Sequence, residues 1–186
     1  MLSEWKMKEN GDRHFVPYTL TQLRNGQFPK DRPVHIFTEG IFDLFHFGHV
    51  RMFRQLKEAF PNVKLTAGIC SDELVQRFKG PLVMTFEERF ASLKSCPYVD
   101  QVVDYGMYWA TLELLDELEA DLMAHDAAPY ACDDGSDCFK PFKDADRFIS
   151  TVRTENISTT ELIQRILDRH EVFCDRNAKR ELKDQS

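Results

Sequence analysis

The feature of this sequence that most constrains its fold is an alternation of short apolar runs with amphipathic helical patterns. Residues 34–38 form a β-type run, and a helix is predicted from about 48 to 59 because its apolar residues recur at three-residue spacing. Pro61 ends this helix, and the apolar run at 63–70 predicts a buried second strand. A strand, a crossover helix and another strand in this order are typical of a parallel sheet.

The same alternation continues to about residue 173. Ser71 and Thr85 are expected N-caps, and Glu88 completes a capping box with Thr85. We expect further helices at 71–78, 85–96, 111–119, 138–146 and from 157–160 toward 173, and further strands at 99–104, 121–124 and 148–152. The pattern predicts an α/β fold, a doubly wound (Rossmann-like) parallel sheet of five strands with helices on both faces, whose ligands bind at the carboxyl ends of the strands.

A chain of 186 residues suits a single domain with tails. Residues 1–32 are polar and interrupted by glycine and proline, so we interpret them as an N-terminal extension with one short helical turn near 19–24. The α/β domain spans 33–174. Residues 175–186 are charged and lack periodicity, which predicts a short, frayed C-terminal tail.

Composition excludes several classes of protein. The formal charge of −7, from 24 Lys and Arg against 31 Asp and Glu, argues against binding to nucleic acid or a membrane surface. No stretch approaches the ~20 apolar residues of a membrane-spanning helix, and the N-terminus lacks the apolar segment of a signal peptide, so we expect a cytoplasmic protein. The cysteines are odd in number and scattered, which predicts reduced thiols, mostly in the core, rather than disulfides or a zinc site: Cys70, Cys96, Cys132, Cys138 and Cys174.

Two histidines lie where the first predicted strand passes into a helix. His46 and His49 are three residues apart, which puts both imidazoles on one face beside the free backbone N–H groups of the helix start. Gly40 and Gly48 let a ligand approach the backbone there. The simpler alternative is that both histidines only cap and pack the helix, but the strand–turn–helix context favours an anion-binding site.

A second candidate anion site lies near the end of the last predicted strand. Arg153 follows that strand, and Ser158, Thr159 and Thr160 begin the last helix. Hydroxyls and open N–H groups at a helix start, beside a guanidinium that can bind phosphate through two hydrogen bonds, form such a site. By itself this pattern is more typical of an N-cap next to a surface arginine. Two such sites at strand ends of one sheet favour the binding of phosphate groups.

These residues match known motifs. HFGH at 46–49 and RTENISTT at 153–160 resemble the HxGH and RTxGISTT motifs of the cytidylyltransferases. Further segments are similar to the choline-phosphate cytidylyltransferases within that family: GIFDLFH at 40–46, FKGPLVM at 78–84, EER at 87–89, YVDQVV at 98–103 and AHDAAPY at 124–130. The resemblance covers roughly 34–169, in the family's order and spacing.

The resemblance implies transfer of CMP from CTP to phosphocholine, which yields CDP-choline and pyrophosphate, with Mg²⁺ carried by CTP. The phosphocholine oxygen attacks the α-phosphorus in line, without a covalent enzyme intermediate. His46 and His49 are implied to stabilise the pentavalent phosphorus. Lys79 is implied to bridge the phosphates of both substrates, and Arg153 to hold the triphosphate. The implied nucleotide contacts, none of them a metal ligand, are Ile41, Phe42, His49, Lys79, His125, Asp126, Tyr130, Val152, Arg153, Thr154, Ile157 and Ser158.

Phosphocholine imposes a separate requirement. A quaternary ammonium donates no hydrogen bond, so it is recognised by aromatic faces and a carboxylate. The resemblance places Trp109, Tyr130 and Phe139 at the positions of an aromatic cage. It places Glu39 at the position of the carboxylate, with Lys79 beside the phosphate. Without the resemblance, Trp109 and Phe139 would be interpreted as core residues.

This chain departs from the family pattern at several of these positions. The family's choline enzymes usually have Asp in place of Glu39 and Tyr in place of Phe139. Phosphoethanolamine is therefore the alternative substrate, because a smaller cation could use Glu39 as a hydrogen-bonding partner. Asn156 stands in place of a glycine, and Asn is the residue besides Gly that best tolerates a positive φ.

The resemblance also implies partners. We expect a homodimer, with its interface near 98–103 and 46–49. The chain ends 26 residues after Thr160, and its charged tail has almost no apolar face, so we expect no membrane-binding helix that responds to lipid. The alternative of a different class is a catalytically silent module that binds a nucleotide. The full set of charged and imidazole groups argues against that alternative.

Overall fold

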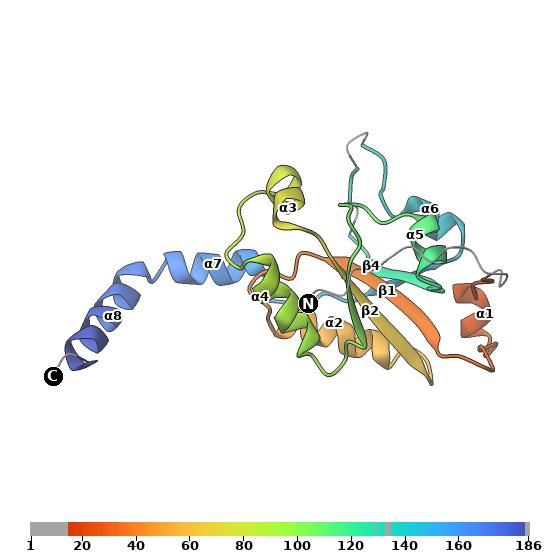
Figure 1. Cartoon of the computed structure of the whole chain (residues 1–186), viewed down its shortest axis with the longest axis horizontal. Helices are drawn as coiled ribbons and strands as arrows, with labels where there is room; N and C mark the ends of the chain where they lie inside the picture. Colours follow the sequence, from red (N-terminus) through yellow and green to blue (C-terminus); the bar gives the residue numbers. More distant parts are fainter. Residues whose placement is uncertain (1–14, 129, 133–134, 185–186) are drawn as a thin grey trace.

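Five parallel strands form the centre of the structure. The computed structural model describes residues 15–128, 130–132 and 135–184. Neighbouring strands pair in parallel in the order β3-β2-β1-β4-β5 (Figure 1). This order confirms the predicted doubly wound sheet. The strands are β1 (Val34–Gly40), β2 (Val63–Ile69), β3 (Gln101–Asp104), β4 (Leu122–Asp126) and β5 (Phe148–Thr151).

Helices connect the strands and extend beyond them at both ends of the chain. They are α1 (Leu20–Arg24), α2 (Phe47–Lys57), α3 (Asp72–Phe78), α4 (Phe86–Lys94), α5 (Leu112–Glu117), α6 (Lys140–Asp144), α7 (Thr159–Leu167) and α8 (His170–Asp184). Both expected N-caps are present, because the hydroxyls of Ser71 and Thr85 accept backbone hydrogen bonds at the starts of α3 and α4. The predicted helix and strand types are confirmed for the α/β domain, with ends that differ by a few residues, except that the single last helix predicted toward 173 is two helices, α7 and α8.

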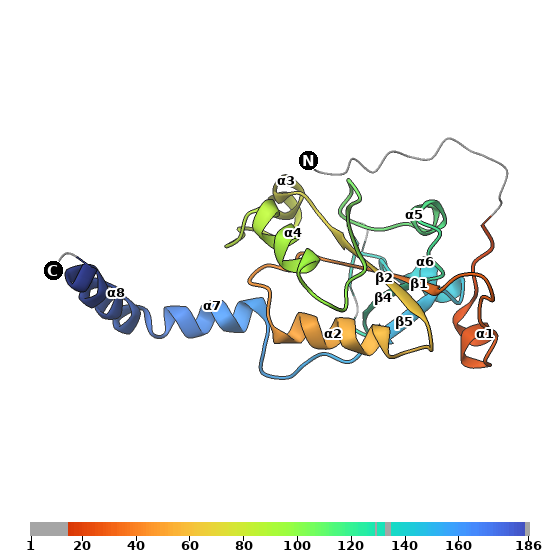
Figure 2. The same cartoon turned by 60° about the horizontal axis from the view of Figure 1, so that its bottom comes forward.

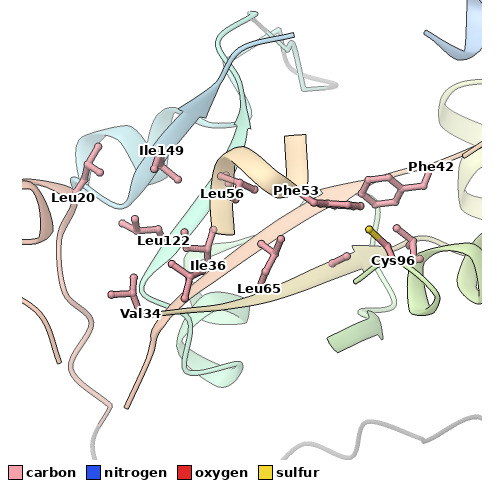
Figure 3. Packing of buried hydrophobic residues seen from close by; sticks show 14 of the residues in the cluster. Leu20, Val34, Ile36, Phe42, Phe53, Leu56, Leu65, Cys96, Leu122 and Ile149 are labelled. Atoms are coloured by element: carbon pink, nitrogen blue, oxygen red, sulfur yellow. The ribbon is translucent and has the colours of Figure 1, made fainter. Parts of the chain in front are cut away.

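Strand β1 is buried on both faces. Its successive side chains point to opposite faces of the sheet, and each face is covered by a hydrophobic core. Ile36 packs in one core with Phe53 and Leu56 of α2 (Figure 3). Phe37 packs in a second core that includes Leu115 of α5. Two helical layers therefore hold β1 in the middle of the sheet, and the loop after its carboxyl end starts from a fixed position.

The described part of the predicted N-terminal extension packs against the α/β domain. Leu20 and Leu23 of α1 are buried in the same core as Ile36. Arg32 forms a bidentate ion pair with the fully buried Asp121, with contacts of 2.6 and 2.7 Å. Residues 1–14 of the extension lie outside the described residues. Segment 15–32 therefore belongs to the folded body rather than to a separate tail.

The C-terminal region contains two helices that extend away from the body of the protein (Figures 1 and 2). None of the residues of α7 is buried. Helix α8 continues to Asp184, so the prediction of a frayed tail is wrong up to that residue. The reason is composition, since segment 175–184 is rich in the strong helix formers Lys, Arg, Glu, Ala and Leu. Residues 185–186 lie outside the described residues.

The cysteines require a second correction. Cys132 and Cys138 form a disulfide, with their Cα atoms 5.2 Å apart, although the scattered spacing predicted reduced thiols. An isolated antiparallel bridge between Ala131 and Asp137 reverses the chain and brings the two cysteines together, which spacing alone does not reveal. Cys70 and Cys96 are buried thiols as expected.

In the described ranges, no helix has both the length and the apolar character needed to cross a bilayer.

Candidate active site

A cleft of about 240 Å³ opens at the carboxyl ends of β1, β4 and β5. It lies at the boundary between β1 and β4, where the strand order reverses and where doubly wound sheets bind their ligands. Glu39 also lines it. All the positions predicted to contact the nucleotide lie along its wall, together with His46: Ile41, Phe42, His49, Lys79, His125, Asp126, Tyr130, Val152, Arg153, Thr154, Ile157 and Ser158.

The two histidines at the start of α2 hold their protons on the same ring nitrogen. The Nδ1 atom of His46 accepts from the backbone N–H of Gly48 at 3.1 Å. The Nδ1 atom of His49 accepts from the backbone N–H of His46 at 3.3 Å. A ring nitrogen that accepts carries no proton, so each neutral imidazole has its proton on Nε2. The start of α2 therefore leaves two Nε2–H groups as donors for a ligand.

Both imidazoles are neutral at physiological pH. Burial, together with the nearby His46 and Lys79, lowers the pKa of His49 to about 3. Burial also lowers the pKa of His46. The two rings stack with their centroids 3.8 Å apart, a distance at which two imidazolium ions would repel each other. An anion beside the pair would therefore be held by hydrogen bonding rather than by charge.

Gly48 allows the start of α2 to approach the segment before α7. A Cβ atom on Gly48 would lie 2.8 Å from Cε1 of His46 and 3.3 Å from Cγ2 of Ile157. Any larger residue would therefore displace the His46 ring or the neighbouring wall of the cleft. Asn156, at the position where the family has glycine, adopts a positive φ of 58° next to Ile157. Asn tolerates this conformation better than most residues other than glycine.

Asp43 ties together three segments around the cleft. Its carboxylate accepts from the backbone N–H groups of Val83 and Met84 at 2.9 and 2.8 Å. Its backbone carbonyl accepts from the Thr159 hydroxyl at 2.8 Å. The loop after β1, the loop after Lys79 and the start of α7 are therefore held in fixed relation to one another.

Arg89 of α4 holds the backbone just after β1 and β2 in place. Its side chain is fully buried, and it donates to the carbonyls of Ile41 and Cys70 at 2.8 and 2.9 Å. It also pairs with Asp72 at 2.6 Å. These backbone contacts give Arg89 a structural role at the strand ends.

Both cations of the predicted site, Lys79 and Arg153, line the cleft. Desolvation, together with Arg153, lowers the pKa of Lys79 below its usual value. The Nε atom of Arg153 lies 3.7 Å from Oδ2 of Asp126. Because Arg153 disfavours the charged form of Lys79, an anion bound between them would stabilise that form.

Two buried polar atoms on the cleft wall have no hydrogen-bond partner in the described residues. They are Nδ1 of His125 and Oγ1 of Thr154. Asp126 lies beside them, with one carboxylate oxygen taken by the backbone N–H of Ala128 at 2.9 Å. Unpaired polar atoms that line a cleft indicate a polar ligand, since leaving them unsatisfied is costly.

The predicted aromatic cage is only partly assembled. Tyr130 lines the cleft and its ring lies edge-on to His125, with centroids 4.6 Å apart. Phe139 is buried behind the cleft wall and stacks on His125. Trp109 packs against Tyr108 and does not line the cleft. The structure therefore brings Glu39, Lys79 and Tyr130 together but does not bring Trp109 to them.

The sequence motifs do not predict three residues in or next to the cleft. Met52 and Thr151 line it, and Tyr105 supports Glu39 from below. Met52 could have been found from its spacing, because it lies one helical turn after His49. Thr151 and Tyr105 carry no such signal.

Metal ligands are sparse. The described residues contain no group of three or more His, Cys, Asp or Glu side chains that could hold a metal ion. The carboxylates of the cleft are Glu39 and Asp126, one from β1 and one from β4. This donor set does not form a protein cage for Mg²⁺, but it leaves room for a cation that is already bound to phosphates.

Comparison with known proteins identifies sequence relatives. The profile of the family described as "Cytidylyltransferase-like" matches residues 37–165. Choline-phosphate cytidylyltransferase A of Mus musculus is 43% identical over 166 residues, which cover 89% of this chain and 45% of the mouse protein. Choline-phosphate cytidylyltransferase 2 of Arabidopsis thaliana is 45% identical over 152 residues, which cover 81% of this chain and 50% of that protein. The chain thus spans about half the length of these relatives.

A more distant relative and a solved structure complete the comparison. Ethanolamine-phosphate cytidylyltransferase of Dictyostelium discoideum is 36% identical over 136 residues, which cover 73% of this chain and 37% of that protein. The crystal structure of a lipopolysaccharide core biosynthesis protein from Thermoplasma volcanium aligns with a TM-score of 0.53 at 13% identity, covering 67% of this chain and 100% of that one. At this identity the structural likeness supports the fold alone.

Proposed function

Because the chain belongs to the cytidylyltransferase-like family, we propose that it transfers CMP from CTP to phosphocholine and releases pyrophosphate. One observation carries the proposal. Two Nε2–H donors, held in position by the start of α2, share a cleft with Lys79 and Arg153. Such a cleft suits a triphosphate and a second phosphate that approaches it.

The reaction needs positioning and charge stabilisation rather than a nucleophile of the protein. A phosphate oxygen of phosphocholine attacks the α-phosphorus of CTP, the new P–O bond forms, and the bond to the β-phosphate breaks to release pyrophosphate. The Nε2–H groups of His46 and His49 donate to the oxygens on which negative charge increases. Lys79 holds the two reacting phosphates together, and Arg153 binds the leaving pyrophosphate.

The nucleoside end of CTP is proposed to lie along β4 and β5. The unpaired atoms of His125 and Thr154 supply polar contacts there. The remaining carboxylate capacity of Asp126 suits the amino group of cytosine, which is a donor. The backbone at Ile41 and Val152 faces the same cleft. This assignment accounts for the two unsatisfied atoms with one ligand.

Mg²⁺ is proposed to arrive on the triphosphate of CTP. Mg²⁺ keeps several waters and prefers phosphate oxygens with at most one or two carboxylates. The absence of a carboxylate cluster in the described residues fits a metal that the substrate carries. When bound, it would neutralise charge on the phosphates.

The head group is proposed to bind between Glu39 and Tyr130. A carboxylate and an aromatic face are the groups that a quaternary ammonium requires. Completion of the cage by Trp109 and Phe139 stays a prediction, and for Trp109 it requires a movement of the segment between β3 and α5. Phosphoethanolamine is the competing substrate, because its primary ammonium could donate directly to Glu39.

We further propose that the protein acts as a homodimer with contacts near the start of α2. Phe47 at this helix start is 60% exposed, and a partner would cover its ring. Light scattering is expected to give twice the mass of the chain, and a monomer at micromolar concentration would contradict it. A cytoplasmic location stays a prediction from the sequence.

Steady-state kinetics test the proposed reaction. The protein is incubated with CTP, Mg²⁺ and either phosphocholine or phosphoethanolamine, and pyrophosphate release is measured. We expect kcat/KM for phosphocholine to exceed that for phosphoethanolamine at least about tenfold, because a cation–π contact favours the quaternary ammonium. An equal or higher value for phosphoethanolamine would refute the choline assignment. CTP binding without turnover would instead support a silent nucleotide-binding module.

A further inference from the structure

Glu39 is a buried acid without an ion-pair partner among the described residues. Its side chain lies at the end of β1 and the residue is 8% exposed. In the described ranges, no Lys, Arg or His side chain forms an ion pair with it. A buried carboxylate in this position needs either a proton or a cation from outside.

The two oxygens of Glu39 have different surroundings. Oε2 accepts from the Tyr105 hydroxyl at 2.8 Å and from the backbone N–H of Ala110 at 3.1 Å. In the described part of the chain no hydrogen bond reaches Oε1, and Glu39 lines the cleft. The carboxylate is therefore held by one oxygen and leaves the other for a ligand.

The ring of Tyr105 is closely packed against Gly68, Phe37 and Cys70. A Cβ atom on Gly68 of β2 would lie 2.9 Å from Cδ1 of Tyr105 and 2.4 Å from Cζ of Phe37. Phe37 meets the Tyr105 ring edge-on at 5.6 Å, and the Cys70 sulfur lies 3.1 Å from the phenol oxygen. Tight packing on these sides directs the hydroxyl toward Glu39.

We propose that Tyr105 is a positioning residue for Glu39, and that the pair makes binding of a cationic head group depend on pH. The inference rests on the proposed function, since it takes phosphocholine as the ligand. Tyr105 keeps the carboxylate pointed at the cleft and favours its ionised form. The ligand supplies the positive charge that the protein lacks at this point.

The protonation of Glu39 supports this arrangement. Burial raises the pKa of Glu39 to about 7, whereas the hydrogen bonds from Tyr105 and Ala110 lower it. Loss of the phenol hydroxyl therefore raises this pKa further. Cys70, Tyr105 and Tyr108 lie next to Glu39. The other titratable or charged groups that line its cleft are His46, His49, Lys79, His125, Asp126, Tyr130 and Arg153.

The direction of the pH effect follows from the sign of the shift. A carboxyl group with a raised pKa is protonated below about pH 7 and ionised above it. Head-group binding to the wild-type protein therefore strengthens as the pH rises through 7. Binding of CTP makes no use of Glu39 and lacks this component.

Tyr105→Phe tests the proposal through kinetics between pH 6 and pH 9. The variant keeps the ring and removes only the hydroxyl. We expect KM for phosphocholine at pH 7 to rise at least about tenfold, the usual effect of losing a hydrogen bond to an ionised group. KM for CTP is expected to stay within about twofold, because its site is made by other residues. The difference in KM for phosphocholine should shrink at pH 9, where Glu39 is ionised in both proteins.

Two further variants separate this role from a structural one. Tyr18→Phe removes a hydroxyl from a ring that lies under Arg32, outside the cleft, and is expected to match the wild type. Glu39→Gln keeps the shape of the side chain and is expected to lose the pH dependence that Glu39 contributes, while the titration of the substrate phosphate near pH 6 remains. An unchanged KM in Tyr105→Phe, or equal losses for both substrates at every pH, would overturn the proposal.

A carbon-13 NMR titration of the Glu39 carboxyl gives a readout that does not need turnover. We expect a midpoint near 7 in the wild type and a higher one in Tyr105→Phe. A midpoint near 4.5 in the wild type, or no change in the variant, would overturn the proposal even if the enzyme is active. Failure of the wild type to use either phospho-alcohol would contradict the proposed function alone. If Tyr105→Phe does not fold, the wild-type midpoint still decides.

Discussion

The two ends of the cleft differ in how completely they are formed. At the phosphate end, backbone N–H groups fix both histidines, Asp43 ties three segments together, and Arg89 holds the strand ends. At the head-group end, Glu39 and Tyr130 face the cleft, but Trp109 lies outside it. The proposed phosphate end is therefore formed without a ligand, whereas the proposed head-group end would have to close around one.

The difference follows from the elements that carry each end. The proposed phosphate end is built on the carboxyl ends of β1 and β5 and on the starts of α2 and α7, whose backbone positions the sheet determines. The head-group end draws Trp109, Tyr130 and Phe139 from the connections β3–α5 and β4–α6. Loops are less constrained than the elements they join, so a site made from them forms more completely when a ligand adds contacts.

The largest effect is expected at the support of the phosphate end. Arg89→Met removes the donors to the carbonyls of Ile41 and Cys70, while Asp72 is 31% exposed and keeps the hydrogen bond from the backbone N–H of Phe86. The cost therefore comes mainly from the two carbonyls left unpaired, at about 1–3 kcal/mol each. We expect the free energy of unfolding, measured in urea, to fall by the sum of these two costs.

Arg77→Met is the matched control for Arg89→Met. Arg77 is an exposed arginine of α3 whose guanidinium lies over the ring of Phe78. A surface substitution of this kind changes the free energy of unfolding by no more than about 0.5 kcal/mol. Equal stability losses in both variants would show that Arg89 is not the support of the phosphate end.

The second effect concerns chemistry at the same end. His49→Ala removes one Nε2–H donor, and we expect kcat to fall at least about 10²-fold, as for other donors that stabilise a transition state. KM for CTP should change only a few-fold, because the lost contact forms mainly in the transition state. Unchanged product formation would contradict the proposal that the phosphate end of the cleft is the catalytic end.

His170→Ala is the control for this measurement. His170 begins α8 and is exposed, with the thiol of Cys174 as its neighbour. Its removal is expected to leave kcat unchanged. A loss comparable to that of His49→Ala would attribute the effect to histidine removal in general.

The difference between residues carried by strand ends and residues carried by loops also explains which site residues the sequence predicts. His46, His49 and Arg153 follow directly from motifs at strand ends, because a parallel sheet brings those ends to one edge. The five strands follow from apolar periodicity. The positions of Trp109 and Phe139 depend on the conformations of the loops that carry them, and hydrophobic periodicity does not predict a loop conformation.

Other features depended on contacts between residues far apart in the chain. Tyr105 reaches Glu39 across 66 positions, and nothing in the local sequence marks either residue for the other. The Cys132–Cys138 disulfide depends on a chain reversal within one loop. Hydrophobic periodicity does not predict the helix of segment 175–184, because that helix has almost no apolar face, whereas its composition of strong helix formers favours it.

The smallest effect is expected at the head-group end. If this end closes around phosphocholine, Trp109→Leu removes one aromatic face and raises KM for phosphocholine about 3- to 10-fold, in line with one cation–π contact. KM for CTP and kcat should stay near the wild-type values, because the phosphate end is formed without Trp109. The buried Nε1 atom of Trp109 has no partner in the described residues, so its present packing is not optimal and a shift toward the cleft is not opposed by a hydrogen bond. A KM for phosphocholine equal to that of the wild type would mean that Glu39 and Tyr130 bind the head group without closure. The two ends of the cleft would then differ in the number of contacts they make and not in their preorganisation.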